Sequence, residues 1–473
     1  MVSSLQVDVL ASIVLFAMNE VLKVASMDRY DVLVAGGGVA GIAAACSAAR
    51  SGAKTLLIER YGFLGGMATA GLVNPFMNYF TSTGKQLVGG FFDEICERMR
   101  EQGGMLDRAF DPEAMKFAAQ EMVLESGCDL MLHSMIVGAR MDGRTAVGVE
   151  VVTKSGMETV DAACLVDATG DADLAAMTGA DYEEGDPDTG FTQAMTTMFI
   201  VGGVDIKRSL LYAVDNPEQM RFPKPQSEDA VERMLQGVVS IAGFFKEVEN
   251  ARLAGEFSLP QDMIFFISLP TPGQVVVNTT HVGGLSGTEH KELTRAEVEG
   301  RRQVISLMRF MRKYIPGFEN SYLVQTAAQI GVRETRRIVG DYIFGKDDVI
   351  HGVKFPDVVL RSAYPVDVHS SVGKGYSKDE ADDGVPGIPP PGDWYEVPYR
   401  CLLPKHVDNL LVAGRCISAT HEGQGALRIM PNCFALGQAA GTAAALSAAN
   451  GVTPRKLDRG LLRRKLLEGG AVI

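Results

Sequence analysis

The chain has 473 residues, of which 46% are hydrophobic and 22% charged, a composition typical of soluble globular proteins with more than one domain. Its formal net charge of −13 and the lack of a long basic run exclude a general nucleic-acid-binding protein. The seven cysteines are scattered and form no C-x-x-C pair. This pattern predicts a reducing compartment, the cytoplasm, and neither an iron–sulfur cluster nor a structural zinc site.

Residues 1–27 are predicted to be an N-terminal extension. Their apolar stretch "VDVLASIVLFAM" is too short to span a bilayer, and no Lys or Arg precedes Lys23 as a secretory signal would require. We therefore expect no stable membrane insertion. An amphipathic peripheral helix and the product of an upstream start codon, with Met27 as the natural beginning, are the two alternatives.

The stretch "DVLVAGGGVAGIAAACSAARSGAKTLLIER", residues 31–60, predicts a strand, a glycine turn, a helix and a second strand. Its turn is a G-x-G-x-x-G at Gly36, Gly38 and Gly41, where glycines permit a tight turn, close approach to a pyrophosphate and close packing of helix on strand. The helix N-terminus then meets the phosphates, and Glu59 follows at the spacing of a ribose-binding carboxylate. These features together predict a dinucleotide site.

The following residues are predicted to complete a first nucleotide-binding part, residues 28–185. Residues 84–127 have helical character, and residues 129–170 alternate apolar and polar residues with turns at Asp142-Gly143 and Ser155-Gly156. This alternation predicts a small antiparallel set of strands that leads into a buried strand ending at Asp167.

Residues 186–395 differ in composition and pattern, with more proline and with mixed helical and strand segments. This change predicts an inserted substrate or cap domain. The proline-rich stretch at residues 382–394 rules out a helix near its end. Residues 396–473 return to the first pattern, with a strand at "NLLVAG" and a helix whose Gly437 and Gly441 indicate very close packing. The predicted fold class is α/β: a Rossmann-like FAD-binding domain, with a parallel sheet and a small antiparallel sheet, carrying an inserted α+β substrate domain.

Three glycine-bearing segments far apart in the chain need one ligand: the first turn, "DATGDADLA" and "VAGRCISAT". A simple NAD domain needs only the first, whereas an extended FAD needs all three. The chain resembles the FAD-dependent oxidoreductase family of the glutathione-reductase-like, two-dinucleotide-binding-domain flavoprotein fold. The similar pieces are "ERYGFLGGMATAG", "VDATGDADLAA", "IGVRETRRIVGDY" and "NLLVAGR…LRIMPNCFALGQAAG", and they span roughly residues 28–470.

The resemblance implies FAD as cofactor, with the pyrophosphate at the first turn, the adenosine beside Glu59 and the flavin at the N-terminus of the last long helix. A positive helix end at that place would stabilise the negative charge of reduced flavin. The residues that it implies for cofactor binding are Gly36, Gly38, Ala40, Gly41, Glu59, Arg60, Gly65, Gly66, Met67, Ile136, Gly170, Asp171, Gly414, Arg415, Asn432 and Cys433.

The first catalytic candidates lie in "GVRETRRIVGDY". On a helix, Arg333 and Arg337 would share a face, with Arg336 beside Arg333. Together with Glu334 this cluster either clamps a carboxylate or other polar substrate, or forms a structural ion-pair network at the domain interface.

The second candidates lie in "HEGQGALR", which contains His421 and Arg428. His421 suits a base that removes a proton as hydride leaves for the flavin, and the alternative is a loop histidine bonded to the backbone. His281 and His369 are weaker candidates from the inserted domain.

Absent motifs narrow the chemistry. No cysteine pair follows the "GG" loop, which excludes dithiol disulfide reduction, and no second G-x-G-x-x-G indicates an NAD(P)H domain. We expect a hydride transfer between a small polar organic substrate and the flavin, with an unidentified electron acceptor or donor and a homo-oligomer left open. The alternatives are a reductase of a carbon–carbon double bond with an arginine as acid, an accessory electron-transfer flavoprotein, and an oxygen-dependent hydroxylase.

Overall fold

The computed structural model describes residues 25–26, 29–371 and 387–473. The expected extension over residues 1–27 and the start of the proline-rich loop lie almost entirely outside these ranges. Residues 387–394 form no helix, as their prolines require. Among the described residues, no helix is both long and apolar enough to cross a membrane.

The first sheet confirms the predicted strand–turn–helix–strand unit. Its parallel part has the order β6-β3-β2-β9, and β20 pairs with the other edge of β9. The strands are β6 (Asp129–Met131), β3 (Thr55–Ile58), β2 (Tyr30–Ala35), β9 (Gly156–Asp167) and β20 (Leu410–Val412). β2 and β3 are buried almost throughout, which is why both read as continuous apolar runs.

β9 also carries the small antiparallel sheet. Its first half pairs with β8 (Thr145–Thr153), which pairs with β7 (Met135–Asp142), and β1 (Ala25–Ser26) adds a short parallel pairing. The turns predicted at Asp142-Gly143 and Ser155-Gly156 connect these strands. Because the second half of β9 pairs with β2 and β20, one strand joins both sheets and ends at Asp167, beside the glycine turn.

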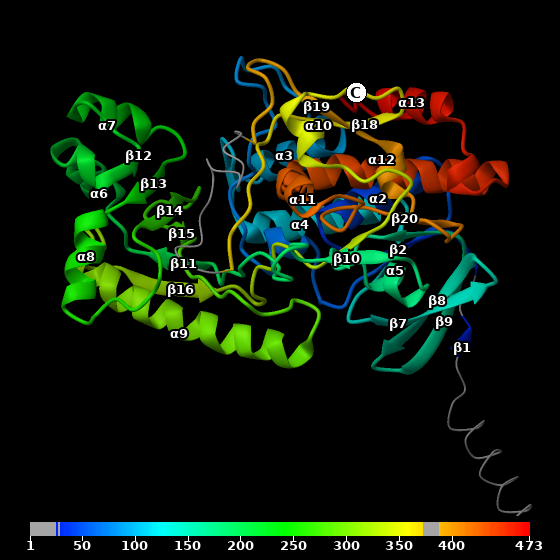
Figure 1. Cartoon of the computed structure of the whole chain (residues 1–473), viewed down its shortest axis with the longest axis horizontal. Coiled ribbons are helices and arrows are strands. Elements are labelled where there is room, and N and C mark those ends of the chain that lie inside the picture. Colours follow the sequence, from blue (N-terminus) through cyan, green and yellow to red (C-terminus); the bar gives the residue numbers. More distant parts are fainter. Residues whose placement is uncertain (1–24, 27–28, 372–386) are drawn as a thin grey trace, which may run out of the picture.

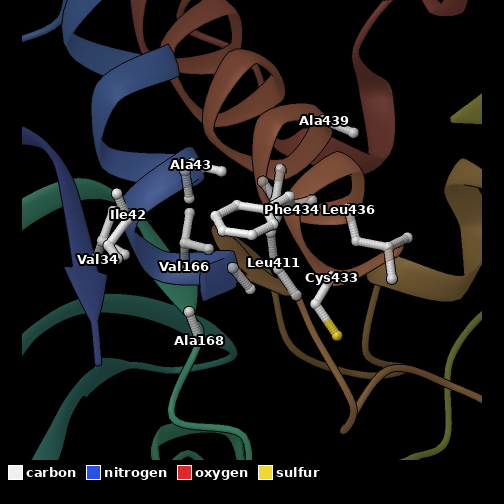
Figure 2. Close-up of a cluster of buried hydrophobic side chains, with 14 of the residues drawn as sticks. Val34, Ile42, Ala43, Val166, Ala168, Leu411, Cys433, Phe434, Leu436 and Ala439 are labelled. Carbon is white, nitrogen blue, oxygen red and sulfur yellow. The ribbon is translucent and has the colours of Figure 1, made fainter. Parts of the chain in front are cut away.

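Two long helices lie against each other over the parallel sheet: α2 (Val39–Arg50) and α12 (Met430–Asn450). A Cβ at Gly437 would lie 2.1 Å from the Ala40 carbonyl oxygen, and one at Gly441 would lie 2.0 Å from that of Ala44. Two missing side chains therefore let the backbones touch, which confirms the predicted close packing. Phe434 fills the space between α2 and the strands that carry Val166 and Leu411 (Figure 2).

Further elements surround this core. The predicted helical stretch at residues 84–127 is two helices separated by a hairpin, and Phe91, Phe92, Ile95 and Met99 are buried as expected. The bounds are α3 (Phe91–Glu101), β4 (Met105–Leu106), β5 (Ala109–Phe110), α4 (Pro112–Glu125), α5 (Asp173–Met177), α10 (Lys346–Ile350), β18 (Val358–Ser362), β19 (Tyr395–Pro398), α11 (His421–Leu427) and α13 (Arg459–Glu468), with short 3₁₀ turns η1 (Gly66–Ala68), η3 (Tyr399–Leu402) and η4 (Pro454–Lys456).

A second lobe, at the left of Figure 1, is built on an antiparallel sheet with its own hydrophobic core, which runs in sequence from Phe199 to Leu323. The strand order is β12-β13-β14-β15-β11-β16, and the long helix α9 covers one side of the lobe (Figure 1). The bounds are β11 (Phe199–Gly202), α6 (Ile206–Asp215), η2 (Pro217–Gln219), β12 (Met220–Phe222), α7 (Glu228–Met234), β13 (Ser240–Gly243), α8 (Phe245–Leu253), β14 (Ile264–Ser268), β15 (Val275–Val277), α9 (His290–Tyr314) and β16 (Tyr322–Thr326). Mixed parallel and antiparallel layers of this kind confirm the predicted α/β class with an added α+β lobe.

The segment between the second lobe and β19 returns to the first core. Ile338, Phe344, Val349 and Leu360 all pack there, although they fall within the predicted inserted domain. The predicted domain boundaries at 185 and 395 stay predictions, and the cores show that the lobe itself is shorter than the stretch between them.

One local prediction is wrong. "GVRETRRIVGDY" is not helical: Arg333 and Glu334 lie in a loop, and β17 (Arg336–Ile338) pairs with β10 (Tyr182–Glu184). The i and i+4 argument for a shared face of Arg333 and Arg337 therefore fails. Strand pairing with a distant segment overrides the local helical preference.

Candidate active site

A large cavity lies where the glycine turn, the end of β9 and the start of α12 meet. It encloses about 1120 Å³ of empty space and is partly open to solvent. Its lining residues are Gly36, Gly38, Val39, Ala40, Ile58, Glu59, Arg60, Tyr61, Gly66, Met67, Ser134, Met135, Ile136, Ala168, Thr169, Gly170, Asp171, Asp173, Leu174, Gln329, Ala413, Gly414, Arg415, Arg428, Met430 and Cys433. Segments more than 390 residues apart in the chain thus form one site, because their strands are neighbours in one parallel sheet.

Most of the residues assigned to the cofactor line this cavity. The three that do not are Gly41, Gly65 and Asn432, and each lies just behind the wall. A Cβ at Gly41 would lie 1.8 Å from the Gly36 carbonyl oxygen, so Gly41 closes the turn. Gly65 donates its N–H to the Gly37 carbonyl oxygen at 2.9 Å and ties the two loops together.

The glycine turn forms a cradle for an anion. α2 begins at Val39 without a side-chain cap, so the N–H groups of its first turn have no acceptor within the helix. A Cβ at Gly38 would meet only the Gly66 Cα, at 3.9 Å, and would otherwise project into the cavity. An anion can therefore approach the positive end of α2 without contacting a side chain.

Glu59 is held at the next part of the cavity wall. It is buried, and its two carboxylate oxygens accept N–H bonds from Gly37 at 2.6 Å and from Tyr61 at 2.8 Å. These bonds orient the carboxylate at the carboxyl end of β3, next to the turn. A ribose hydroxyl could donate to it there, as the spacing predicted.

Asp171 and Arg415 close the opposite wall. Arg415 Nη2 lies 2.5 Å from Asp171 Oδ1, which also accepts from the Thr335 hydroxyl at 2.9 Å. Asp173 lies beside them and pairs with Arg336. Burial, and then the charges of Asp171 and Asp167, raise the pKa of Asp173 to about 6.

Arg428 and Cys433 mark the far end of the cavity, at the start of α12. Arg428 Nη2 donates to the Asp367 carboxylate at 3.1 Å and to its carbonyl oxygen at 3.0 Å, whereas the buried Arg428 Nε has no partner. Burial raises the pKa of the Cys433 thiol to about 12, so this cysteine is a neutral packing residue. Figure 2 shows its side chain directed away from Ala43.

Three of the four residues chosen as catalytic do not line the cavity. Glu334 is fully buried and pairs with Arg337, while its oxygens lie 2.8 Å from His421 Nδ1 and 3.1 Å from the Gln193 N–H. This network joins β17, α11 and the chain leading to the second lobe. It has the form of the structural ion-pair network that was the alternative to substrate binding for this cluster. The catalytic assignments of His421, Glu334, Arg333 and Arg428 stay predictions, and only Arg428 lines the cavity.

Arg333 and His369 instead form a separate group beside Arg428. Asp367 lies between Arg428 and His369, since its Oδ2 accepts from Arg428 and, at 2.7 Å, from the Tyr364 hydroxyl, while its Oδ1 lies 3.5 Å from His369 Nε2; its charge also acts on Arg333. Burial and the charge of Arg333 lower the pKa of His369 to about 4, so this imidazole is neutral. Asp367 was not recognised from sequence, although its neighbour His369 was noted.

Other lining residues were also missed. Thr169 and Asp173 stand within the quoted "DATGDADLA", so the motif itself could have indicated them. Gln329 comes from the loop after β16 and accepts from Arg60 Nη2 at 3.0 Å, a contact for which no local pattern exists. Among the described residues, no group of three or more His, Cys, Asp or Glu could hold a metal ion.

The donor set fits an FAD. The cavity offers an anion cradle at α2 and an oriented carboxylate at Glu59. At the start of α12 it offers a buried Arg428 Nε that lacks an acceptor among the described residues. These three features match a pyrophosphate, an adenosine ribose and the electron-rich edge of a flavin.

Several solved structures resemble the chain over most of its length, at low sequence identity and with TM-scores below 0.5. A geranylgeranyl bacteriochlorophyll reductase-like protein from Thermoplasma acidophilum is 13% identical with a TM-score of 0.42, covering 94% of this chain and 84% of its own. The p-nitrophenol 4-monooxygenase of Pseudomonas putida is 10% identical with a TM-score of 0.44, covering 94% and 85%. The L-proline dehydrogenase of P. horikoshii is 12% identical with a TM-score of 0.39, covering 94% and 100%. No curated protein matches the chain.

The family itself is shown by a sequence model. The model described as FAD dependent oxidoreductase matches residues 31–466, which include every segment of the cavity wall. The chain therefore belongs to the FAD-dependent oxidoreductase family, and FAD is its cofactor.

Proposed function

We propose that the enzyme transfers a hydride between a small polar organic substrate and the flavin. The observation that carries this proposal is the polar group behind Arg428 at the far end of the cavity: Asp367 binds Arg428 and lies beside His369, and the charges of Arg428 and Asp367 act on Arg333. When bound, FAD supplies the two-electron chemistry. The protein groups at that end are suited to bind and orient a polar substrate and to accept a proton.

His369 is the proton acceptor that fits this geometry best. It is neutral because burial and Arg333 depress its pKa, and its Nε2 faces the Asp367 carboxylate, which can stabilise the positive charge gained on protonation. Neither histidine lines the cavity, but His421, the base favoured by the sequence pattern, directs Nδ1 at the buried Glu334, whereas His369 shares Asp367 with the lining residue Arg428. We therefore propose His369 in the role predicted for His421.

A second candidate function is reduction of a carbon–carbon double bond with an arginine as acid. Burial, together with the nearby charge of Arg428, lowers the pKa of Arg333 to about 10, which favours proton donation more than an ordinary guanidinium does. The hydride would then travel from the flavin to the substrate.

An anaerobic absorbance titration of the holoenzyme separates these functions. Bleaching of the oxidised flavin band by hydroxy acids, amines or sugars, but not by NADH or NADPH, would support a dehydrogenase or oxidase. Bleaching by a nicotinamide alone would support the reductase or a hydroxylase. A flavin that none of these donors reduces would contradict the proposal and favour the accessory electron-transfer protein.

We place the chain among the glutathione-reductase-like flavoproteins because its glycine segments occur in the order that this group requires. We also propose a cytoplasmic location, supported by seven buried cysteines without a disulfide. A small-molecule substrate, an electron acceptor or donor and a homo-oligomeric state are the partners we propose.

A further inference from the structure

Arg333 presents a free guanidinium edge. Its Nη1 donates to the Ala194 carbonyl oxygen at 2.5 Å and to the Thr196 hydroxyl at 2.8 Å. Its Nε and Nη2 have no hydrogen-bond partner among the described residues, and neither atom is fully buried. One edge is thus fixed by the protein, while the other can receive a ligand with two oxygens in one plane.

The part of the chain that the structure describes supplies no carboxylate for that edge. The charge of Asp367 acts on Arg333, but Asp367 Oδ2 binds Arg428 and Tyr364, and its buried Oδ1 lies 3.5 Å from His369 Nε2 without a hydrogen-bond partner among the described residues. Glu334, the next residue in the chain, is committed to Arg337 and His421. Among the described residues, no carboxylate lies within ion-pair distance of Arg333.

Counted over the described residues, the group therefore has one positive charge in excess. Arg333 and Arg428 are two cations near one anion, Asp367. Burial alone would raise the pKa of Asp367, but His369 and Arg428 hold it well below its usual range. His369 is neutral, and burial together with Arg333 also lowers the pKa of His281. A bound anion would balance the excess charge in a poorly solvated place.

A hollow lined by two arginines and one glutamate has His281 in its wall, and the charge of Arg333 acts on that histidine. It holds about 760 Å³ and is lined on one side by His281 and on the other by Arg295, Glu299 and Arg302 of α9. Both arginines are exposed, and neither pairs with a carboxylate among the described residues. In a chain of net charge −13, such a local excess of cations raises the concentration of anions at one entrance.

We propose that the substrate carries a carboxylate, which Arg333 binds through its free Nε and Nη2 edge after entry by way of the hollow at His281. This inference rests on the proposed function, because it assigns the substrate class of the same site. Bidentate binding at Arg333 would hold the reacting carbon beside Arg428 and the start of α12, where the cofactor cavity ends.

The test measures binding rather than turnover. The holoenzyme is titrated anaerobically with acetate, lactate and benzoate and with the three matching amides, and the flavin absorbance change and the thermal midpoint are recorded. We expect saturable binding of at least one acid and an amide affinity about tenfold or more lower, since a charge-assisted bond is lost. Equal affinities for acid and amide, or no saturable binding by any acid, would overturn the proposal.

Variants then locate the site. Arg333→Met is expected to weaken acid binding about tenfold or more and to leave amide binding unchanged, with Arg333→Lys intermediate because it keeps the charge and loses the fork. The control is Arg301→Met on α9, an exposed arginine paired with Glu297 and outside the hollow. Acid binding that is unchanged in a flavin-loaded Arg333→Lys or Arg333→Met protein would reject the assignment.

Because acetate and benzoate need not be oxidised, the two proposals fail separately. A flavin that no organic donor reduces, in a protein that still binds acids through Arg333, would contradict the hydride-transfer function alone.

Discussion

Glu334 illustrates how strongly burial decides the role of a single residue. Its carboxylate is fully enclosed, touches Arg337 and His421, and accepts the Gln193 N–H. The sequence motif indicated Glu334 as a candidate and left open whether it was structural or catalytic. The alternatives could not be separated from sequence, because only the fold shows that distant segments enclose it.

Glu334→Gln should destabilise the protein by about 3 kcal/mol, because it leaves the buried charge of Arg337 without its partner. The measurement is the free energy of unfolding in urea. Glu97→Gln, which breaks an exposed pair with Arg100, is the matched control and should have little effect. An unchanged unfolding curve together with a lost rate of flavin reduction would instead make Glu334 catalytic.

Ionisation of Asp173 should make the FAD affinity of the cavity depend on pH. Its pKa of about 6 lies above the ordinary value of 3.8, so it is largely protonated near pH 5 and charged near pH 7.5. A negative charge on this lining residue repels the pyrophosphate, and FAD affinity should therefore fall as pH rises through about 6, by roughly threefold to tenfold. The same sign holds for stability: the raised pKa makes ionisation of Asp173 unfavourable in the fold, and stability is lost as pH rises from 3.8 toward 6.

The check is the dissociation constant of FAD, from fluorescence quenching on reconstitution of apoprotein at several pH values. Asp173→Asn should flatten the profile, while Asp188→Asn, an exposed residue outside the cavity, should preserve it. A wild-type profile that is already flat would show that Asp173 does not sense the phosphates.

The element scale is dominated by the contact of α2 with α12. The small residues of both helices were visible in sequence, and the spacing of Gly437 and Gly441 correctly predicted a close approach. Which helix is the neighbour was not predictable, because α2 and α12 are almost four hundred residues apart and meet only through the order of β2, β9 and β20.

Gly441→Ala should lower stability by about 1–3 kcal/mol, because its Cβ would lie 2.0 Å from the Ala44 carbonyl oxygen and force the helices apart. The readout is the thermal midpoint of the holoenzyme together with its flavin content, since α2 carries the anion cradle. Gly460→Ala in the exposed start of α13 is the control, where the added methyl group should be neutral or slightly stabilising. Equal midpoints in both variants would refute the close-packing argument.

At the scale of the whole molecule, the cofactor cavity brings together segments that lie far apart in the chain. The cavity wall takes residues from the first turn, from the end of β9, from the loop after β16 and from the start of α12. A ligand that contacts all of them stabilises the folded state by mass action.

FAD at a hundredfold excess over its dissociation constant should stabilise the apoprotein by about 2.7 kcal/mol. FMN and ADP at the same concentration should each give a smaller shift of the thermal midpoint, because each occupies only one end of the cavity. If FMN matches FAD, the adenosine end at Glu59 contributes nothing and the extended binding mode is wrong.

The sequence by itself determined the first nucleotide-binding unit, the buried strands and the close helix packing, because each depends on neighbouring residues or on glycine spacing along one element. It also determined the FAD family, because several local motifs occur together in one order along the chain. Only the tertiary structure decided that residues 336–338 form a strand, that His421 turns to Glu334, and that Asp367 and His369 lie behind Arg428 at one end of the cavity. The physical reason is that hydrogen bonds and charge compensation in the interior depend on which distant segments the sheet brings together, and strand order leaves no local pattern in the chain.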